Sequence, residues 1–214
     1  FPARRTQATG NPVRAEIRTG DARAARATLG LDGDRFTVLV FGGSQGAHRL
    51  NQAVLQALPE LARDGAQLQF VHATGARDLE KVRRGYEASR VRARVEPFID
   101  DMALAYQAAD FVVCRAGAGT VFELAAVGKP ALLVPYPYAA NDHQRLNAEA
   151  AVQAGAAWIL LDQYCDGQRI VASVRAAREK PAQLAEMGRR ALALARPDAA
   201  DRIVDLLEKV ALAA

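Results

Sequence analysis

Short apolar runs alternate with stretches of helical periodicity along most of this chain. The clearest run is Phe36–Phe41 (FTVLVF), which is typical of a strand buried on both faces of a parallel sheet. Further strands are predicted at Leu68–His72, Ala93–Pro97, Asp110–Cys114, Ala131–Pro135 and Ala157–Leu161. Helices are predicted at Asp21–Leu29, Ala47–Arg63, Arg77–Ala88, Asp100–Ala108, Thr120–Val127 and His143–Ala154, with more helix after breaks at Gly167 and Pro181.

This alternation predicts a single α/β domain built on a doubly wound, Rossmann-like parallel sheet. We expect a lead-in segment at residues 1–20, the sheet domain at residues 21–195 and a C-terminal helix at residues 196–214. Ligands of such sheets bind beyond the carboxyl ends of the strands. The loops predicted at those ends are Gly42–Ala47, Glu96–Asp101, Arg115–Thr120 and Pro135–Gln144.

Composition narrows the class of ligand. A net charge of +4 and a pI near 9.3 fit an anionic small molecule, an anionic membrane surface or a nucleic acid. Aromatic residues make up only 6%, which argues against a nucleic-acid surface, because such surfaces stack bases on aromatic rings. One group of arginines is interpreted either as solvated surface or as a membrane-surface patch: Arg83, Arg84, Arg90, Arg92 and Arg94.

Cysteine content and hydropathy bear on the cellular setting. Cys114 and Cys165 are too few for a disulfide framework and lack metal-ligand spacing, so we expect a reducing, cytoplasmic setting. No apolar stretch approaches the roughly 20 residues that span a bilayer, so any membrane contact is expected to be peripheral. The chain starts at Phe1 without a methionine, which is typical of a piece of a longer protein.

The loop Gly42–Ala47 (GGSQGA) is a candidate phosphate site. It lies between a predicted strand and a predicted helix, where glycines let a phosphate approach the backbone and free amides attract an anion. The Ser44 hydroxyl adds a donor. Because the pattern matches neither the P-loop nor the dinucleotide fingerprint, an ordinary strand-to-helix turn remains the alternative.

A second loop of small residues, Arg115–Thr120 (RAGAGT), repeats this arrangement and points to a diphosphate or a nucleotide. Arg115 is suited to neutralising phosphate or stacking on a base, with a surface ion pair as the alternative. Glu123 follows Thr120 by three residues. It is interpreted either as half of a capping box with Thr120 or as a carboxylate that binds two vicinal hydroxyls.

The segment Pro135–Asn147 (PYPYAANDHQRLN) concentrates hydrogen-bonding side chains at the start of a predicted helix. Sugars need many donors and acceptors, because each hydroxyl exchanges its hydrogen bonds to water for equivalent ones. Capping of the helix by Asn141 or Asp142 is the structural alternative. A catalytic base at His143 is disfavoured, because its neighbours are hydrogen-bonding rather than activating groups.

Several motifs in order resemble the MurG family of glycosyltransferases. They are GGSQGA at Gly42–Ala47, FIDDM at Phe98–Met102, VCRAGAGTVFELAAVGKPALLVPYP at Val113–Pro137 and DHQRLNA at Asp142–Ala148. TGNPVR at Thr9–Arg14 resembles the segment where that family's second domain begins. The resemblance implies the C-terminal, donor-binding domain of a two-domain enzyme of GT-B type.

Members of this family transfer N-acetylglucosamine from UDP-N-acetylglucosamine to lipid-linked muramoyl-pentapeptide in peptidoglycan synthesis. They invert the anomeric centre and are not expected to need a metal or another cofactor. They act as peripheral proteins on the cytoplasmic face of the bacterial plasma membrane. The resemblance, which runs over roughly residues 9–160, implies these partners here and no nucleic acid.

The resemblance also implies a role for individual residues. The implied UDP-sugar site has Arg14, Ser44 and Gln45 at the diphosphate, Phe98, Ile99 and Arg115 around the uracil, Ala118, Gly119, Thr120, Val121, Phe122 and Glu123 along the nucleotide and sugar, and His143 and Gln144 at the N-acetylglucosamine. Glu123 is implied to bind the ribose hydroxyls, and Ile99 to meet the uracil through its backbone.

One departure from the family is large. The family's other domain carries the acceptor site and is expected to supply the catalytic base, and nothing in this sequence resembles it. We therefore expect no catalytic residue in this chain, which should bind the donor sugar without transferring it alone. The alternatives are a related glycosyltransferase with a different donor or lipid acceptor, and a non-catalytic nucleotide-binding module.

Overall fold

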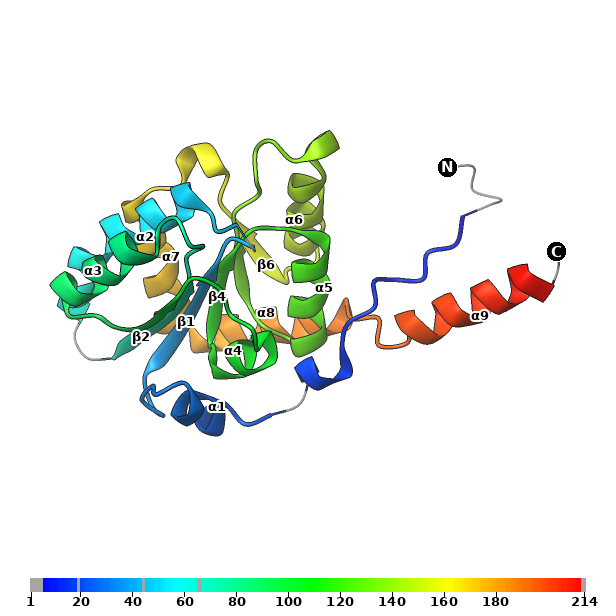
Figure 1. Ribbon diagram of the computed structural model, residues 1–214, viewed down its shortest axis with the longest axis horizontal. Coiled ribbons are helices and arrows are strands. Elements are labelled where there is room, and N and C mark those ends of the chain that lie inside the picture. Colours follow the sequence, from blue (N-terminus) through cyan, green and yellow to red (C-terminus); the bar gives the residue numbers. More distant parts are fainter. Residues whose placement is uncertain (1–5, 19, 44, 65–66, 213–214) are drawn as a thin grey trace.

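The computed structural model describes residues 6–18, 20–43, 45–64 and 67–212. The strands are β1 (Phe36–Phe41), β2 (Leu68–Ala73), β3 (Arg92–Glu96), β4 (Phe111–Cys114), β5 (Ala131–Leu133) and β6 (Ala157–Ile159). They form one parallel sheet in the order β3-β2-β1-β4-β5-β6 (Figure 1). Every predicted strand is confirmed, and the ends differ from the prediction by at most two residues.

Helices precede the first strand, connect the strands and follow the last of them. They are α1 (Ala22–Thr28), α2 (His48–Leu61), α3 (Leu79–Ser89), α4 (Met102–Ala108), α5 (Ala118–Val127), α6 (His143–Gln153), α7 (Gly167–Glu179), α8 (Pro181–Ala193) and α9 (Ala199–Leu212). The side chains of Asp21, Asp101 and Asp166 each accept a hydrogen bond from a backbone N–H three residues later. These caps satisfy amides that lack an intrahelical partner.

The core lies in two layers, one on each face of the sheet. Because side chains of a strand alternate between faces, Val38 and Val40 of β1 pack in the cluster that includes α2, α3 and α7. Leu39 and Phe41 point the other way, into the cluster that includes α4, α5 and α6. The sheet is thus covered by helices on both faces, as its continuous apolar strands predict (Figure 1).

The strand order places the candidate site. It reverses at β1, which has β2 on one side and β4 on the other. In doubly wound sheets the loops that follow the strands at such a reversal diverge and leave a crevice where ligands bind. Here those loops are residues 42–47 after β1 and residues 115–117 after β4.

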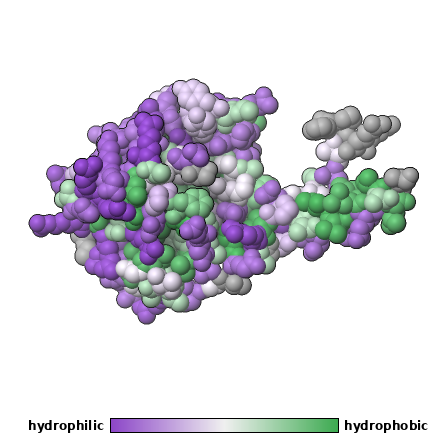
Figure 2. Space-filling model, in the orientation of Figure 1, coloured by the Kyte–Doolittle hydropathy of each residue, from purple (hydrophilic) through white to green (hydrophobic). Residues whose placement is uncertain are grey.

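The C-terminal helix α9 extends away from the body of the domain (Figure 1). The N-terminal segment runs beside it, and Arg202 Nη2 donates a hydrogen bond to the Ala8 carbonyl oxygen at 3.1 Å. Ala199 is buried, but Val204, Leu207 and Val210 are more than half exposed and form an apolar face on α9 (Figure 2). None of the described helices is long and apolar enough to cross a membrane.

Candidate functional site

A cleft of about 530 Å³ lies at the carboxyl ends of the central strands. This size is in the range of small-molecule sites in proteins. Loops after β1, β4, β5 and β6 contribute to it, so residues far apart in the sequence meet there. The lining residues are Gly42, Gln45, Gly46, Ala47, His48, Arg49, Arg115, Tyr136, Pro137, Tyr138, Gln144 and Asp162.

The glycine loop owes its composition partly to close packing. A Cβ at Gly46, whose φ is +73°, would lie 2.1 Å from the Thr74 carbonyl oxygen. A Cβ at Gly42 would lie 2.3 Å from the Cβ of Ala47. Both glycines are therefore required by sterics before any ligand is considered. Gln45 is exposed and lines the cleft, whereas Ser44 lies outside the described residues.

The start of α5 follows the loop after β4 but does not itself line this cleft. The helix begins at Ala118, two residues earlier than predicted, with Gly117 at the N-cap and no side-chain cap. Thr120 is therefore already helical, and the interpretation of Thr120 and Glu123 as a capping box is wrong. Ala118 and Gly119 are exposed, so the first amides of α5 remain open to an anion.

Glu123 instead accepts a hydrogen bond from the Tyr106 hydroxyl at 3.0 Å. Tyr106 is buried, and burial, aided by the nearby negative charges, raises the pKa of its phenol well above the usual value. The phenol therefore stays protonated and orients the Glu123 carboxylate. A carboxylate has about four acceptor positions, so capacity remains for two vicinal hydroxyls.

Arg115 is buried rather than at the surface. Its Nη1 donates to the Val134 and Pro135 carbonyl oxygens, both at 3.1 Å, and lies 2.6 Å from Asp162 Oδ1. The guanidinium also lies 5.5 Å from the centre of the Tyr136 ring. The alternative of a surface ion pair is wrong, because the side chains of Arg115 and Asp162 are only 10% and 12% exposed.

Gln144 joins two loops of the cleft. Its Oε1 accepts from the backbone N–H groups of Ala116, at 3.2 Å, and Tyr136, at 3.0 Å. Asn147 reinforces the same contact by donating to the Ala116 carbonyl oxygen at 3.0 Å. Because the oxygen of Gln144 is held in this way, its amide orientation is set and Nε2 is the group available to donate to a ligand.

His143 is placed by an uncommon backbone. Asn141 and Asp142 both have left-handed conformations, with φ of +52° and +53°. Asp142 occupies the N-cap of α6 but its side chain makes no capping bond, and Asn141 lies in the preceding turn, so the capping interpretation is wrong. The His143 Nδ1 lies 2.8 Å from the Ala140 carbonyl oxygen and donates to it, which leaves Nε2 as an acceptor.

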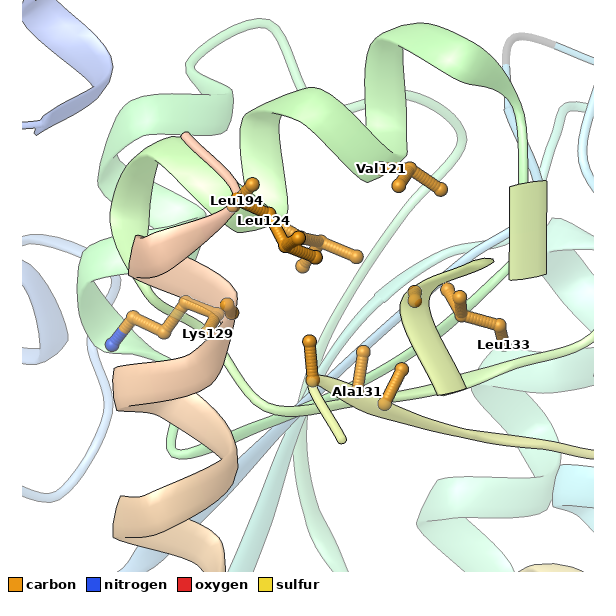
Figure 3. A pocket seen from close by; sticks show the side chains of 11 residues that line it. Val121, Leu124, Lys129, Ala131, Leu133 and Leu194 are labelled. Atoms are coloured by element: carbon orange, nitrogen blue, oxygen red, sulfur yellow. The ribbon is translucent and has the colours of Figure 1, made fainter. Parts of the chain in front are cut away.

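Other predicted site residues lie elsewhere along the strand ends. Arg14 lines a separate hollow of about 510 Å³ beside the start of α4, together with Asp100 and Asp101. Phe98 is 53% exposed, whereas Ile99 is half-buried against the core. Val121 faces a small apolar cavity behind α5 (Figure 3). The described residues do not place Arg14 against Gln45, so a shared role at one diphosphate stays a prediction.

Sequence reasoning missed several residues of the cleft. His48, Arg49, Tyr136, Tyr138 and Asp162 all line it, yet none belonged to the implied binding set. Two signals were available: His48 and Arg49 directly follow the glycine loop, and Tyr136 and Tyr138 lie in the predicted loop Pro135–Gln144. Asp162 had none, because only the tertiary structure brings it beside Arg115. Among the described residues, no group of three or more histidine, cysteine, aspartate or glutamate side chains is placed to hold a metal ion.

A doubly wound parallel sheet whose strand reversal carries two small-residue loops and a polar cleft defines the class of Rossmann-like ligand-binding domains. The comparison with known families makes the assignment specific. Residues 37–203 match the glycosyltransferase family 28 C-terminal domain. The chain belongs to this family.

Individual relatives agree with the predicted resemblance. The chain is 50% identical over 204 residues to the UDP-N-acetylglucosamine–N-acetylmuramyl-(pentapeptide) pyrophosphoryl-undecaprenol N-acetylglucosamine transferase of Geobacter sp. (strain M21). That alignment covers 95% of this chain and 54% of the relative. The chain thus spans about half the length of the curated relatives that it matches.

Solved structures give the same result. Acinetobacter baumannii MurG is similar with a TM-score of 0.73 and 34% identity, over 82% of this chain and 52% of that chain. The glycosyltransferase WaaG, at 18% identity and a TM-score of 0.62, covers 92% of this chain and 55% of that chain and supports the fold alone. The resemblance to the MurG family and the Rossmann-like fold of GT-B type are both confirmed.

Proposed function

We propose that this chain binds UDP-N-acetylglucosamine and forms the donor-binding part of a transferase. The acceptor would be a lipid-linked muramoyl-pentapeptide, as the names of the curated relatives indicate. One observation supports donor binding most directly. The glycine loop and Gln144 line one cleft at the strand reversal, and the open start of α5 follows the same strand ends.

The diphosphate is the group that these elements suit. Backbone amides of the glycine loop and of the first turn of α5 supply donors, and the α5 dipole adds a partial positive charge. Hydrogen bonds to a charged group contribute about 1.5–3 kcal/mol each. They strengthen as UDP departs, because negative charge accumulates on the diphosphate when the bond to the sugar breaks.

Side chains would bind the ribose, the N-acetylglucosamine and the uracil of the donor. Glu123, oriented by Tyr106, is suited to the ribose hydroxyls. Gln144 Nε2 is available to donate a hydrogen bond, and His143 Nε2 is available to accept one. Together they suit sugar hydroxyls, which both donate and accept. We place the uracil near Ile99 and Phe98 on the resemblance alone. Arg115 would support this pocket by holding the loop after β5 through its hydrogen bonds to the Val134 and Pro135 carbonyl oxygens.

Transfer requires groups that lie beyond this chain's donor site. We propose that a further domain supplies the acceptor site and the base, and that residues 1–20 and 196–214 connect to it while residues 21–195 form the donor domain. The exposed apolar face of α9 supports this division, because such faces are usually covered in the complete protein. We place the whole protein at the cytoplasmic face of the plasma membrane as a peripheral protein.

Calorimetric titration with UDP-N-acetylglucosamine, UDP-glucose and UDP tests the proposal. Glu123→Ala is the test variant, and Glu87→Ala on the exposed side of α3 is the matched control. We expect preference for the N-acetyl sugar and a loss of about tenfold or more in the Glu123 variant only. Binding of UDP without a sugar preference would leave a nucleotide site with another donor, and equal affinities of both variants would contradict the role of Glu123.

A transfer assay tests whether the catalytic base lies in another domain. This chain with UDP-N-acetylglucosamine and a lipid-diphosphate acceptor analogue should yield no disaccharide, because the base is expected outside it. The longer protein should yield the β-linked disaccharide. Product formed by this chain alone would contradict the assignment of the base to another domain.

A further inference from the structure

The first residue of α2, His48, enters the wall of the cleft. It follows the glycine loop directly, its side chain is 50% exposed, and it lines the cleft with Gln45 and Arg49. The sequence alone indicates no role for it, because a histidine next to a glycine loop matches no recognisable motif. Its partner comes from a loop thirty residues later in the chain.

That partner is Asp78, which holds one side of the imidazole ring. His48 Nδ1 lies 2.8 Å from Asp78 Oδ1 and 2.9 Å from Oδ2. The Asp78 side chain is only 8% exposed. Although Asp78 stands at the N-cap of α3, it makes no capping hydrogen bond there and is turned toward His48 instead.

A buried network keeps this carboxylate in place. Asn51 Nδ2 donates to Asp78 Oδ2 at 2.9 Å and to the Thr74 carbonyl oxygen at 2.8 Å. Asn51 Oδ1 lies 3.0 Å from Nε2 of His72, which in turn contacts the Tyr86 hydroxyl. Burial acts to raise the pKa of Asp78, but the hydrogen bonds from Asn51 and His48 outweigh it, and the pKa lies below its usual value. Asp78 is therefore an anion that accepts from His48.

The cleft beside His48 carries further cationic groups. Arg49 is half exposed, with Nη2 donating to the Gln163 carbonyl oxygen at 2.7 Å and Nε 3.7 Å from Asp162. Arg115 lies behind the same wall. With Nδ1 of His48 occupied by Asp78, Nε2 is the ring nitrogen left for a ligand. An imidazolium donates from both nitrogens, so this wall of the cleft is suited to an anion.

We propose that His48 is a diphosphate-binding residue whose Nε2–H donates to a diphosphate oxygen of the ligand in the cleft, with Asp78 as its positioning residue. The inference rests on the proposed function and extends it to a residue outside the implied binding set. A diphosphate occurs both in the UDP-sugar and in a lipid-diphosphate acceptor. The chemistry recognised is the same, and the experiment distinguishes the two sources.

The test compares UDP with uridine in the full-length protein that contains this chain. His48→Gln removes the imidazole donor, and Arg63→Gln is the control, because Arg63 is exposed and does not line the cleft. By calorimetry, His48→Gln should weaken UDP binding about tenfold or more and leave uridine binding unchanged. Arg63→Gln should change neither affinity.

Asp78→Asn tests the positioning role by the same readout. It should weaken UDP binding selectively, because the imidazole loses its anionic partner. Equal losses for UDP and uridine in both variants would mean a merely structural effect and would overturn the inference.

The outcomes separate this inference from the proposed function. Failure of the unsubstituted protein to bind UDP would overturn both. Normal UDP binding that His48→Gln leaves unchanged would overturn the inference alone, unless the KM for the lipid-diphosphate acceptor rises tenfold or more. That rise would support diphosphate binding by His48 and assign the diphosphate to the acceptor.

Discussion

At the scale of single residues, His72 illustrates how burial changes the chemistry of a side chain. It lies on β2, is fully buried, and contacts Asn51 and Tyr86 through its two ring nitrogens. Burial lowers the pKa of His72 to about 3, far below its ordinary value of 6.5. The ring is therefore neutral in the folded protein and serves as a structural link rather than a base.

This shift makes a prediction about stability and pH. Between pH 6.5 and 3 the unfolded chain binds a proton at His72 that the folded chain does not, so the free energy of unfolding should fall as pH falls. From pH 6 to pH 5 the loss should be about 1 kcal/mol greater for the unsubstituted protein than for His72→Gln. Urea denaturation at both pH values measures the difference. Parallel pH dependences of the two proteins would show that His72 is not held neutral.

Tyr106 predicts a residue-scale effect on binding. Tyr106→Phe removes the 3.0 Å hydrogen bond to Glu123 while keeping the buried ring. If that bond orients the carboxylate, UDP affinity should fall roughly threefold to tenfold, and affinity for 2′,3′-dideoxy-UDP should not change. Calorimetry measures both, with Tyr164→Phe on the exposed surface as the control. An equal loss for the dideoxy ligand would argue against a contact between Glu123 and the ribose.

At the scale of elements, the turn before α6 shows strain that no sequence pattern indicates. Two successive non-glycine residues, Asn141 and Asp142, have left-handed backbones. Such conformations cost about 1–2 kcal/mol for residues with a Cβ, and asparagine and aspartate tolerate them best. Strain of this kind is often found at binding loops, where the surrounding structure enforces it.

A pair of substitutions at Asn141 tests this account. Asn141→Ala should be about 1 kcal/mol less stable than Asn141→Gly, because only glycine adopts the left-handed region without a steric penalty. Thermal or urea unfolding of the two variants gives the difference. If the alanine variant is as stable as the glycine variant, the left-handed turn is not present in solution.

The cavity behind α5 is a second feature at this scale (Figure 3). Its volume of about 20 Å³ leaves room for roughly one water molecule, and its lining is apolar apart from Lys129. The Lys129 amine donates to the Ala109 carbonyl oxygen at 2.6 Å, so it is not directed at a ligand in the cavity. We interpret the cavity as a packing defect between α5, α6, α8 and the sheet rather than a ligand site.

Filling it should stabilise the domain. Ala131→Val on β5 places two carbons in the cavity and suits a strand, so the free energy of unfolding should rise by up to about 1 kcal/mol. Ala73→Val on β2, a buried strand position that does not line the cavity, should lower it by about 1 kcal/mol or more through overpacking. Urea unfolding of both variants is the measurement. Equal destabilisation would indicate that the space is already filled.

At the scale of the whole molecule, α9 is the element least engaged with this domain. Leu207 and Val210 are 64% and 63% exposed. Replacing both with glutamate should change the free energy of unfolding of this chain by no more than about 0.5 kcal/mol for each substitution, as for other exposed positions. In the longer protein the same change should lower sugar transfer, if α9 packs on the second domain. Unchanged transfer would argue against that contact.

The amino-acid sequence by itself determined the sheet and most helices of this protein. Continuous apolar runs such as Phe36–Phe41 bury both faces of a strand and therefore allow little else. The sequence also identified the family, because the motifs GGSQGA and RAGAGT follow predicted strands in the order expected for it. The starts of helices were harder to predict from the sequence. For example, α5 begins at Ala118 and not at Thr120, because glycine also occupies N-cap positions and Gly117 does so here.

Only the tertiary structure decided how the cleft is built. Arg115 is buried against Asp162, a residue that nothing in the sequence linked to it, and its place at the uracil stays a prediction. His48 meets Asp78 for the same reason, because the parallel pairing of β1 with β2 brings their following loops together. The periodicity of apolar residues indicates which face of a helix or strand is buried, and this pattern involves only residues close together in the chain. Partnerships between polar side chains depend on which strand ends become neighbours, and that is decided only when the sheet forms.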